Sequence, residues 1–312
     1  MSIGVVGVGN MGLAMALRLR DAGMAVAVRD IDGAREALAA QGGCTVAVDA
    51  AALAAGCELL IVAVVDAGQC DEVLLGAGGA ATTLRPGQTV MLCPTIAPAD
   101  TERLAAALAV RGVDVIDAPM SGGPLRARQG TMSLMLAADA ALLQRWQAVL
   151  AQLSDRQFRV SERVGDGART KLVNNLLAAA NLAAAAEALA LAQQVGLDAA
   201  TTLGVIEQSS GQSWIGSDRL HRALACDAAA QAHLALLAKD TALALDLARA
   251  AGAAVPVGAA AAACFAGAMA AGHARDDDSV LLRWLQAQRS GNLSVNKVPG
   301  LAPAPAPPPR AG

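Results

Sequence analysis

The sequence predicts an α/β protein: an N-terminal doubly wound domain, then an all-helical C-terminal domain that one long helix joins to it. Three observations support this fold class. Strand-like and helix-like segments alternate from the first residues to about residue 160, which is typical of a sheet covered by helices. A glycine-rich loop follows the first strand-like segment. Strand signals vanish beyond residue 166, and residues 165–196 have the composition of one continuous helix.

The strand-like segments of the first half are short and rich in β-branched residues. Most are apolar at every position, as expected of strands buried on both faces of a parallel sheet. They cover residues 2–8, 25–30, 44–48, 58–65, 88–93 and 113–117, with two further candidates at 130–139 and 158–163. Helical periodicity or helix-forming composition marks the segments at residues 11–23, 33–41, 69–76 and 99–112.

The length and the change of pattern predict three segments. A chain of 312 residues exceeds what one core comfortably covers, so two domains are expected. We place the α/β domain at residues 1–162, the helical domain at 163–292 and a disordered Pro/Ala-rich tail at 293–312. An unbroken helix of about 29 residues would be roughly 44 Å long, which suits a connection between two domains.

Charge and composition exclude several classes of partner. The chain has 24 basic and 27 acidic residues without basic clusters, and only 2% aromatic residues, so we expect no nucleic-acid partner. Its six cysteines show no CxxC pair and no zinc-site spacing, so we expect no metal. The N-terminus lacks the features of a secretory signal, which predicts a cytoplasmic protein.

The mean hydropathy of +0.44 raises the question of a membrane span, and residues 176–192 are the segment to test. Asn181 and Glu187 interrupt this segment, and alanine, its main component, is only weakly apolar. We therefore predict a helix buried between protein surfaces and no membrane partner.

A glycine-rich motif predicts a dinucleotide site. The sequence GVGNMG fits the GxGxxG pattern of Rossmann domains, and it lies between a predicted strand and a predicted helix. Glycines at these positions let the backbone approach a pyrophosphate at the start of a helix. The predicted cofactor-binding residues of the motif are Gly7, Val8, Gly9, Asn10, Met11 and Gly12.

Asp30 sets the expected choice of cofactor. It ends the second predicted strand, 18 positions after Gly12, where an acidic side chain would bind the ribose hydroxyls. Its charge would repel a 2′-phosphate, so NAD is the predicted cofactor. Arg29 and Arg35 are close enough in the sequence to contact such a phosphate, so NADP remains the alternative.

Residue counting narrows the choice of acid or base. The chain has no tyrosine, which excludes mechanisms with a tyrosine proton donor, and it shows no zinc-ligand spacing. Its histidines, His221, His233 and His273, lie in the helical half without an obvious carboxylate partner. We expect surface or packing roles for them.

Lys171 is the remaining candidate. Asn175 lies four residues later, and so on the same helical face, with Asn174 beside it. Burial would lower the pKa of the lysine toward a range in which it exchanges protons with a substrate oxygen. The residues alone leave open a second interpretation, a lysine that extends to solvent beside other polar residues at a helix start.

Four blocks, in this order, resemble the β-hydroxyacid dehydrogenase family typified by 3-hydroxyisobutyrate dehydrogenase. They are GVGNMGLAMALRL at the glycine loop, DAPMSGGPLRARQGTMSLML at 117–136, GARTKLVNNLLAAANLAAAAEAL at 167–189 and LLAKDTALALDLA at 236–248. The resemblance extends from residue 2 to about residue 290. The segment GQSW at 211–214 is similar to a branch that includes L-threonate dehydrogenases.

The resemblance implies roles for particular residues. Lys171 would be the catalytic acid/base, and Asn175 would contact the substrate. Three backbone N–H groups would hold the substrate carboxylate, those of Ser121, Gly122 and Gly123. The family positions that contact the cofactor correspond here to Val64, Val65, Thr95 and Lys239.

These residues predict reversible oxidation, with NAD, of the hydroxyl of a short 3-hydroxy acid similar to 3-hydroxyisobutyrate or L-threonate. Two alternatives stay open. One is an NADPH-dependent reductase of glyoxylate or succinic semialdehyde, and the other is a nucleotide-binding interaction protein without turnover. The apolar faces of the helical half predict a homodimer or homotetramer.

Overall fold

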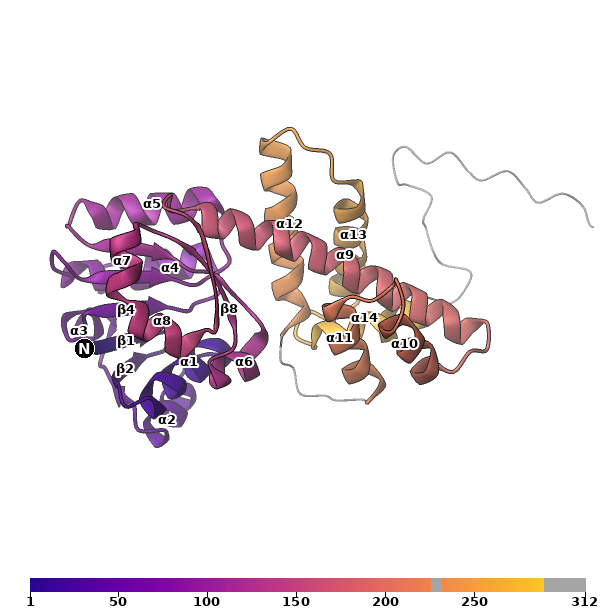
Figure 1. The fold of residues 1–312 in the computed structure, drawn as a ribbon, viewed down its shortest axis with the longest axis horizontal. Helices are drawn as coiled ribbons and strands as arrows, with labels where there is room; N and C mark the ends of the chain where they lie inside the picture. The colour runs from indigo at the N-terminus through magenta and orange to yellow at the C-terminus, as the bar shows by residue number, and fades with distance from the viewer. Residues whose placement is uncertain (226–231, 289–312) are drawn as a thin grey trace, which may run out of the picture.

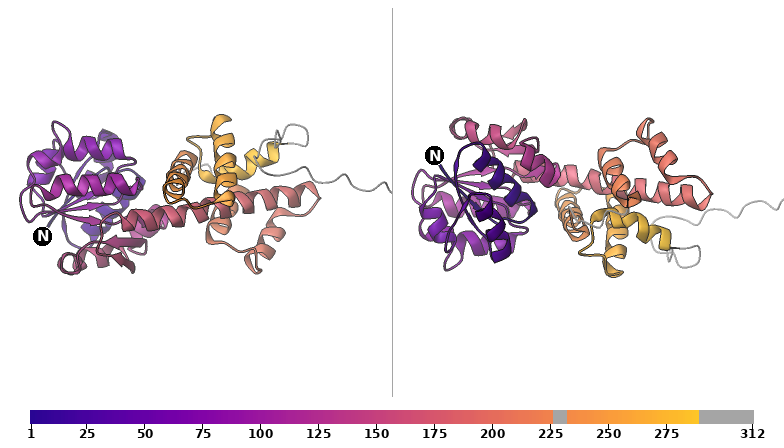
Figure 2. Two further views of the ribbon diagram at one scale, coloured as in Figure 1. Left: turned by 90° about the horizontal axis from the view of Figure 1, so that it is seen from above. Right: turned by 90° about the horizontal axis from the view of Figure 1, so that it is seen from below.

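The computed structural model describes residues 1–225 and 232–288, which form two lobes joined by one long helix (Figure 1). The N-terminal lobe is an α/β domain, and the C-terminal lobe is built from helices (Figures 1 and 2). The predicted fold class is thereby confirmed. The predicted tail at 293–312 and the end of the predicted helical domain lie outside the described residues, and the boundary at 162/163 stays a prediction.

Nine strands of the described chain form one sheet in the N-terminal lobe. They are β1 (Ser2–Val6), β2 (Ala25–Arg29), β3 (Thr45–Val46), β4 (Leu59–Val62), β5 (Thr89–Leu92), β6 (Asp114–Asp117), β7 (Met120–Ser121), β8 (Ser133–Ala137) and β9 (Arg156–Ser161). The order is β3-β2-β1-β4-β5-β6-β8-β7, and β9 pairs with β8. The first six strands pair in parallel, in the 3-2-1-4-5-6 order of a Rossmann domain.

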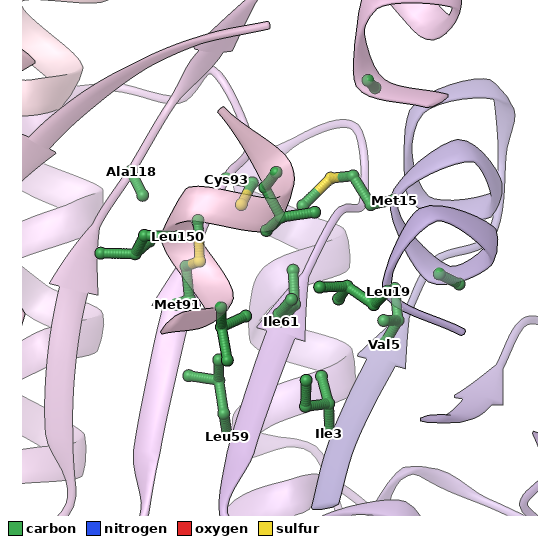
Figure 3. Packing of buried hydrophobic residues seen from close by; sticks show 14 of the residues in the cluster. Ile3, Val5, Met15, Leu19, Leu59, Ile61, Met91, Cys93, Ala118 and Leu150 are labelled. Carbon is green, nitrogen blue, oxygen red and sulfur yellow. The ribbon is translucent and has the colours of Figure 1, made fainter. Parts of the chain in front are cut away.

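Helices cover both faces of the sheet because its strands are apolar on both sides. On one face, Ile3, Val5 and Ile61 pack against Met15 and Leu19 (Figure 3). The helices on this face are α1 (Asn10–Asp21), α2 (Gly33–Gln41), α6 (Gly123–Gln129), α7 (Ala140–Arg145) and α8 (Gln147–Leu153). The opposite face is covered by α3 (Ala50–Ala55), α4 (Ala67–Leu75) and α5 (Pro98–Ala109).

The joining helix α9 (Asp166–Gln194) contacts β6 and β8 near its start and the helices of the second lobe along the rest of its length. It is long and apolar enough to cross a membrane, but 44% of its most apolar window is buried inside the structure. The core helix of a soluble protein passes the same test. The predicted cytoplasmic location stays a prediction.

The helices of the second lobe pack around α9. Leu182, Leu189 and Phe265 are fully buried in their common core. The helices are α10 (Ala199–Glu207), α11 (Trp214–Leu224), α12 (Leu234–Ala250), α13 (Pro256–Ala270) and α14 (Leu281–Ala287).

Candidate active site

The glycine loop between β1 and α1 has a shape that requires two of its glycines. Gly7 has a φ of 86°, in the left-handed region that favours glycine. A Cβ on Gly12 would lie 1.9 Å from the carbonyl oxygen of Gly7. A Cβ on Gly9 would meet nothing within 4 Å, so this side of the loop is open. The loop therefore fits a group that approaches its backbone closely, as a pyrophosphate does.

Asp30 follows β2 and faces this loop. Its Oδ2 accepts a hydrogen bond of 2.6 Å from the backbone N–H of Val8, and its Oδ1 accepts one of 2.9 Å from the N–H of Asp32. The neighbouring Arg29 is held in a 2.6 Å ion pair with Glu36. The carboxylate of Asp30 is thus fixed against the glycine loop, while the guanidinium of the adjacent Arg29 is paired with another carboxylate.

A cleft of about 590 Å³ lies between the lobes and collects most of the residues predicted for the site. The predicted residues that line it are Gly9, Asn10, Met11, Val64, Val65, Thr95, Ser121, Gly122, Gly123, Lys171, Asn175 and Lys239. The other predicted residues, Gly7, Val8, Gly12 and Asp30, do not line this cleft. Segments from both lobes, separated by more than 200 residues, therefore meet in one cavity.

Lys171 lies in the second turn of α9 and is buried, with 8% of its surface exposed. Burial lowers the pKa of its ammonium from 10.5 to about 8. The carboxylate of Asp240 raises this pKa, and the nearby charge of Lys239 lowers it. Near neutral pH the amine can therefore both accept and release a proton, as a general acid/base must. The alternative of a lysine extended into solvent is wrong.

A polar chain connects this lysine's helix to α12. The side-chain amide of Asn175 donates a 2.6 Å hydrogen bond to Oδ2 of Asp240, and Asn174 donates one of 3.0 Å to Asn175. Nζ of Lys239 lies 2.8 Å from Oδ1 of Asp240 and also donates to the backbone oxygen of Thr95. Lys239 thereby bridges the two lobes beside the glycine loop.

The segment Ser121–Gly123 lines the same cleft as Lys171 of α9. Gly122 and Gly123 have φ values of 124° and 74°, so two successive residues adopt backbone conformations that L side chains avoid. Backbone turns of this kind gather N–H groups into a concavity that can bind an anion. Ser121 itself is held in place by antiparallel pairing with Ser133 of β8.

Asp117 anchors the start of α9 to the sheet. It ends β6 and is 1% exposed, and its Oδ2 accepts hydrogen bonds from the N–H groups of Gly165, at 2.8 Å, and Ala168, at 3.1 Å. Burial raises its pKa to about 6. A carboxylate from β6 thus caps the helix that carries Lys171, three residues beyond Ala168.

Comparison with known proteins identifies the family. Residues 2–164 match the NAD binding domain of 6-phosphogluconate dehydrogenase, and residues 165–285 match the NAD-binding domain of NADP-dependent 3-hydroxyisobutyrate dehydrogenase. The L-threonate dehydrogenase of Cupriavidus necator is 35% identical over 282 residues, which cover 90% of this chain and 95% of that protein. The chain belongs to the β-hydroxyacid dehydrogenase family.

Two further family members are similar over nearly the whole chain. The 2-(hydroxymethyl)glutarate dehydrogenase of Eubacterium barkeri is 31% identical, over 91% of this chain and 95% of that protein. The solved structure of 3-hydroxyisobutyrate dehydrogenase from Salmonella typhimurium superposes with a TM-score of 0.85 at 32% identity, over 91% and 99% of the two chains. The protein is therefore a hydroxyacid dehydrogenase, and not an interaction protein without turnover.

Several cleft residues of this β-hydroxyacid dehydrogenase escaped the sequence analysis. Arg219 and Trp214 of α11 line the cleft, as does Asp240. Arg35, which the sequence offered as a contact to a 2′-phosphate, lines it too. Asp117 was missed as well. The quoted blocks contained Asp117 and Asp240, and GQSW contained Trp214, but sequence gave no reason to assign them a role. Arg219 carried no signal beyond its charge.

The histidines have polar partners that sequence spacing did not reveal. His221 lies 2.8 Å from Glu207, and His273 lies 2.7 Å from Asp276. The sequence had shown no obvious carboxylate partner for either histidine, and the expected surface role fits His221, whose side chain is 62% exposed. His233 lines the cleft, and its Nδ1 lies 2.6 Å from a backbone oxygen. Within residues 1–225 and 232–288, no cluster of three or more His, Cys, Asp or Glu side chains could hold a metal ion.

Proposed function

We propose that this dehydrogenase uses NAD to oxidise, reversibly, the hydroxyl of a short 3-hydroxy acid similar to 3-hydroxyisobutyrate or L-threonate. Lys171 is the acid/base. One observation carries the proposal: a buried amine with a pKa lowered to about 8 shares its cleft with the glycine loop and with Ser121–Gly123. The similarity to L-threonate and 2-(hydroxymethyl)glutarate dehydrogenases supports a short hydroxy acid as the substrate.

The chemistry divides between the cofactor and the side chains of the cleft. A bound nicotinamide supplies the acceptor for the hydride that leaves the alcohol carbon. Lys171, in its neutral form, takes the hydroxyl proton as the carbonyl forms, and its ammonium returns that proton in the reverse direction. One amide hydrogen of Asn175 binds Asp240, and the second would bind the substrate hydroxyl.

The substrate carboxylate would bind to the backbone of Ser121–Gly123. The positive φ values of Gly122 and Gly123 support this assignment, because they shape the concavity without side chains that would fill it. With the carboxylate on one wall and Lys171 on the other, the alcohol carbon would lie between them. Such positioning supplies much of the rate enhancement in reactions of this kind.

NAD is the proposed cofactor because of Asp30. Its carboxylate is fixed against the glycine loop, where it would bind ribose hydroxyls and repel a 2′-phosphate. Arg29, which could neutralise such a phosphate, is paired with Glu36. Arg35 lines the cleft, and it is the observation that favours the alternative, an NADPH-dependent reductase of glyoxylate or succinic semialdehyde.

A substrate panel tests the proposal. The purified protein is incubated with NAD or NADP and with 3-hydroxyisobutyrate or L-threonate, and in the reverse direction with NADH or NADPH and glyoxylate or succinic semialdehyde. We expect NAD-dependent oxidation of at least one hydroxy acid and none by Lys171→Ala. A strong preference for NADPH together with aldehyde reduction would replace the proposal with its alternative.

A further inference from the structure

A second hollow adjoins the main cleft beyond the Ser121–Gly123 segment. It has a volume of about 150 Å³, and Gly122, Gly123 and Trp214 line both the hollow and the cleft. Arg126 lines only the hollow, whereas Ser121 and Lys171 line only the cleft. A molecule whose carboxylate is bound at Gly122 and Gly123 could therefore extend away from the reacting carbon into this space.

Two guanidinium groups lie near the ring of Trp214 in the hollow. Cζ of Arg126, from the α/β lobe, lies 5.0 Å from the centre of its ring, and Cζ of Arg219 lies 6.0 Å from it. The stem of Arg126 runs over Gly122, because a Cβ on that glycine would lie 2.8 Å from Cδ of the arginine. The missing side chain at residue 122 thus makes room for Arg126 next to the proposed carboxylate site.

The two arginines differ in how their charges are balanced. Arg219 pairs with Asp278 at 2.7 Å and also with Asp218. Within the described ranges, Arg126 has no ion pair, and its guanidinium lies over the ring of Trp214. A guanidinium stacked on an aromatic face keeps its N–H donors in the plane of the group, directed away from the ring.

We propose that Arg126 binds the far end of the substrate, and that the preferred substrate is a hydroxy acid with oxygen acceptors at that end. Such an acceptor is either a further hydroxyl or a second carboxylate. Stacking on Trp214 orients the guanidinium, and the hollow provides space for the extra atoms. This inference rests on the proposed function, since it assigns the substrate class of the same cleft.

Two variants of Arg126 and one control test the inference. Arg126→Met keeps the length of the stem but removes the charge and the donors, and Arg126→Lys keeps the charge without the paired donors. Arg128→Met is the control, because Arg128 lies on the same helix and forms an exposed ion pair with Asp21. The substrates are 3-hydroxyisobutyrate, with an apolar far end, L-threonate, with hydroxyls, and 2-(hydroxymethyl)glutarate, with a second carboxylate.

Of the two substrates with distal oxygens, the one that the wild type uses best is the informative one. For this substrate we expect Arg126→Met to lower kcat/KM about 10-fold to 100-fold, mainly by raising KM. A loss of this size corresponds to the loss of a charge-assisted hydrogen bond. For 3-hydroxyisobutyrate, kcat/KM of Arg126→Met should stay within about threefold of the wild type. For Arg128→Met, kcat/KM should stay within about threefold of the wild type with every substrate. A loss specific to 2-(hydroxymethyl)glutarate would assign a carboxylate, and a loss specific to L-threonate would assign hydroxyls. Equal losses for all three substrates, or none, would overturn the inference.

A binding measurement separates failure of this inference from failure of the proposed function. If none of the three acids is oxidised, the proposed function fails, and each acid is titrated by calorimetry into the protein with NADH. Weaker binding to Arg126→Met of only those acids that have distal oxygens would still support the role of Arg126. Equal binding to wild type and variant, or no binding to either, would refute it.

Discussion

Asn175 donates a hydrogen bond of 2.6 Å to Asp240, and this contact ties α9 to α12 one helical turn from Lys171. Asp240 also lies 2.8 Å from the ammonium of Lys239. The carboxylate raises the pKa of Lys171, and the ammonium of Lys239 lowers it, against a larger lowering by burial. Two adjacent residues therefore shift the pKa of the same amine in opposite directions.

The pH dependence of the reaction should follow Lys171. Its pKa of about 8 means that it loses its proton as the pH rises through about 8. Oxidation needs the neutral amine, so its rate should rise in that window, whereas reduction needs the ammonium, and its rate should fall. Profiles of kcat/KM against pH, recorded in both directions at saturating cofactor, measure the rise and the fall. If the rates of oxidation and reduction changed in the same direction with pH, Lys171 would be excluded as the titrating group.

Substitutions of Asp240 and Lys239 should move the midpoint of the pH profile in opposite directions. Asp240→Asn removes a charge that favours the ammonium, so the midpoint should fall, while an oxygen acceptor for Asn175 remains. Lys239→Met removes a charge that disfavours the ammonium, so the midpoint should rise. The same pH profiles give both values. Shifts in one common direction would point to a general disturbance of the cleft.

Lys171→Ala should abolish turnover with little effect on binding of the dinucleotide. Loss of a general acid/base typically lowers kcat about 10²-fold to 10⁴-fold. The glycine loop and Asp30 are joined by the hydrogen bond from the N–H of Val8, to which the lysine does not contribute. Stopped assays give kcat, and quenching of protein fluorescence gives the Kd for NADH. An alanine variant that retains activity would remove Lys171 from its role.

Asp117 should make stability depend on pH in the direction opposite to that of an ordinary ion-paired carboxylate. Its pKa is raised to about 6 in the folded protein, so the folded state holds the proton more tightly than the unfolded chain. Its contribution to stability is complete below the unfolded value near 4 and is lost as the pH rises through about 6. Relative to Asp117→Asn, the wild type should gain about 1–2 kcal/mol between pH 7 and pH 5.

Urea unfolding of both proteins at several pH values measures this difference. The pKa of the buried Asp278 is also raised to about 6, but this group is present in both proteins and cancels. Asparagine keeps an oxygen that can accept the N–H groups of Gly165 and Ala168. If the unfolding free energies of the two proteins changed with pH in parallel, the pKa of Asp117 would not be raised in the folded state, and the prediction would be wrong.

The fold and the glycine loop could be predicted because their signals are local in the sequence. Gly7 and Gly12 are separated by five positions, and the apolar strands of a parallel sheet can be recognised one at a time. Lys171 and Asn175 could be paired because an α-helix places residues four apart on one face. The joining helix was long enough for its composition to outweigh its polar interruptions.

The remaining parts depend on contacts between distant segments. Asp117 caps a helix that begins about 50 residues later, and no local pattern marks such a partner. The two-residue strand β7 exists because β8 pairs with it, and α6 begins at Gly123, inside the segment proposed to bind the carboxylate. The stacking of Arg126 on Trp214 crosses from one lobe to the other. Only the folded chain brings these residues together.

Asp30→Asn should increase the use of NADP relative to NAD. The substitution removes the charge that repels a 2′-phosphate but keeps an oxygen that can accept the N–H of Val8. A tenfold rise in the ratio of kcat/KM values corresponds to about 1.4 kcal/mol, a reasonable effect for one close charge. Asp32→Asn is the control, since its exposed carboxylate caps α2. An equal rise in both variants would indicate a long-range effect of net charge.

The outer face of α9 should form an interface between copies of the chain. Val173 and Leu191 are 64% and 58% exposed, and their spacing of 18 residues, about five helical turns, places both on one side of the helix. Leu177, which is 62% exposed, lies near this side but lines the cleft. An apolar stripe of this length on an exposed helix is typical of a surface that associates. We therefore expect a homodimer or homotetramer in sedimentation at micromolar concentration and a shift toward monomer in Leu191→Glu.

Val110→Glu, on the α/β lobe at an 87% exposed position, should not change the distribution. A monomeric wild type would refute the prediction, and equal dissociation in both variants would place the interface elsewhere.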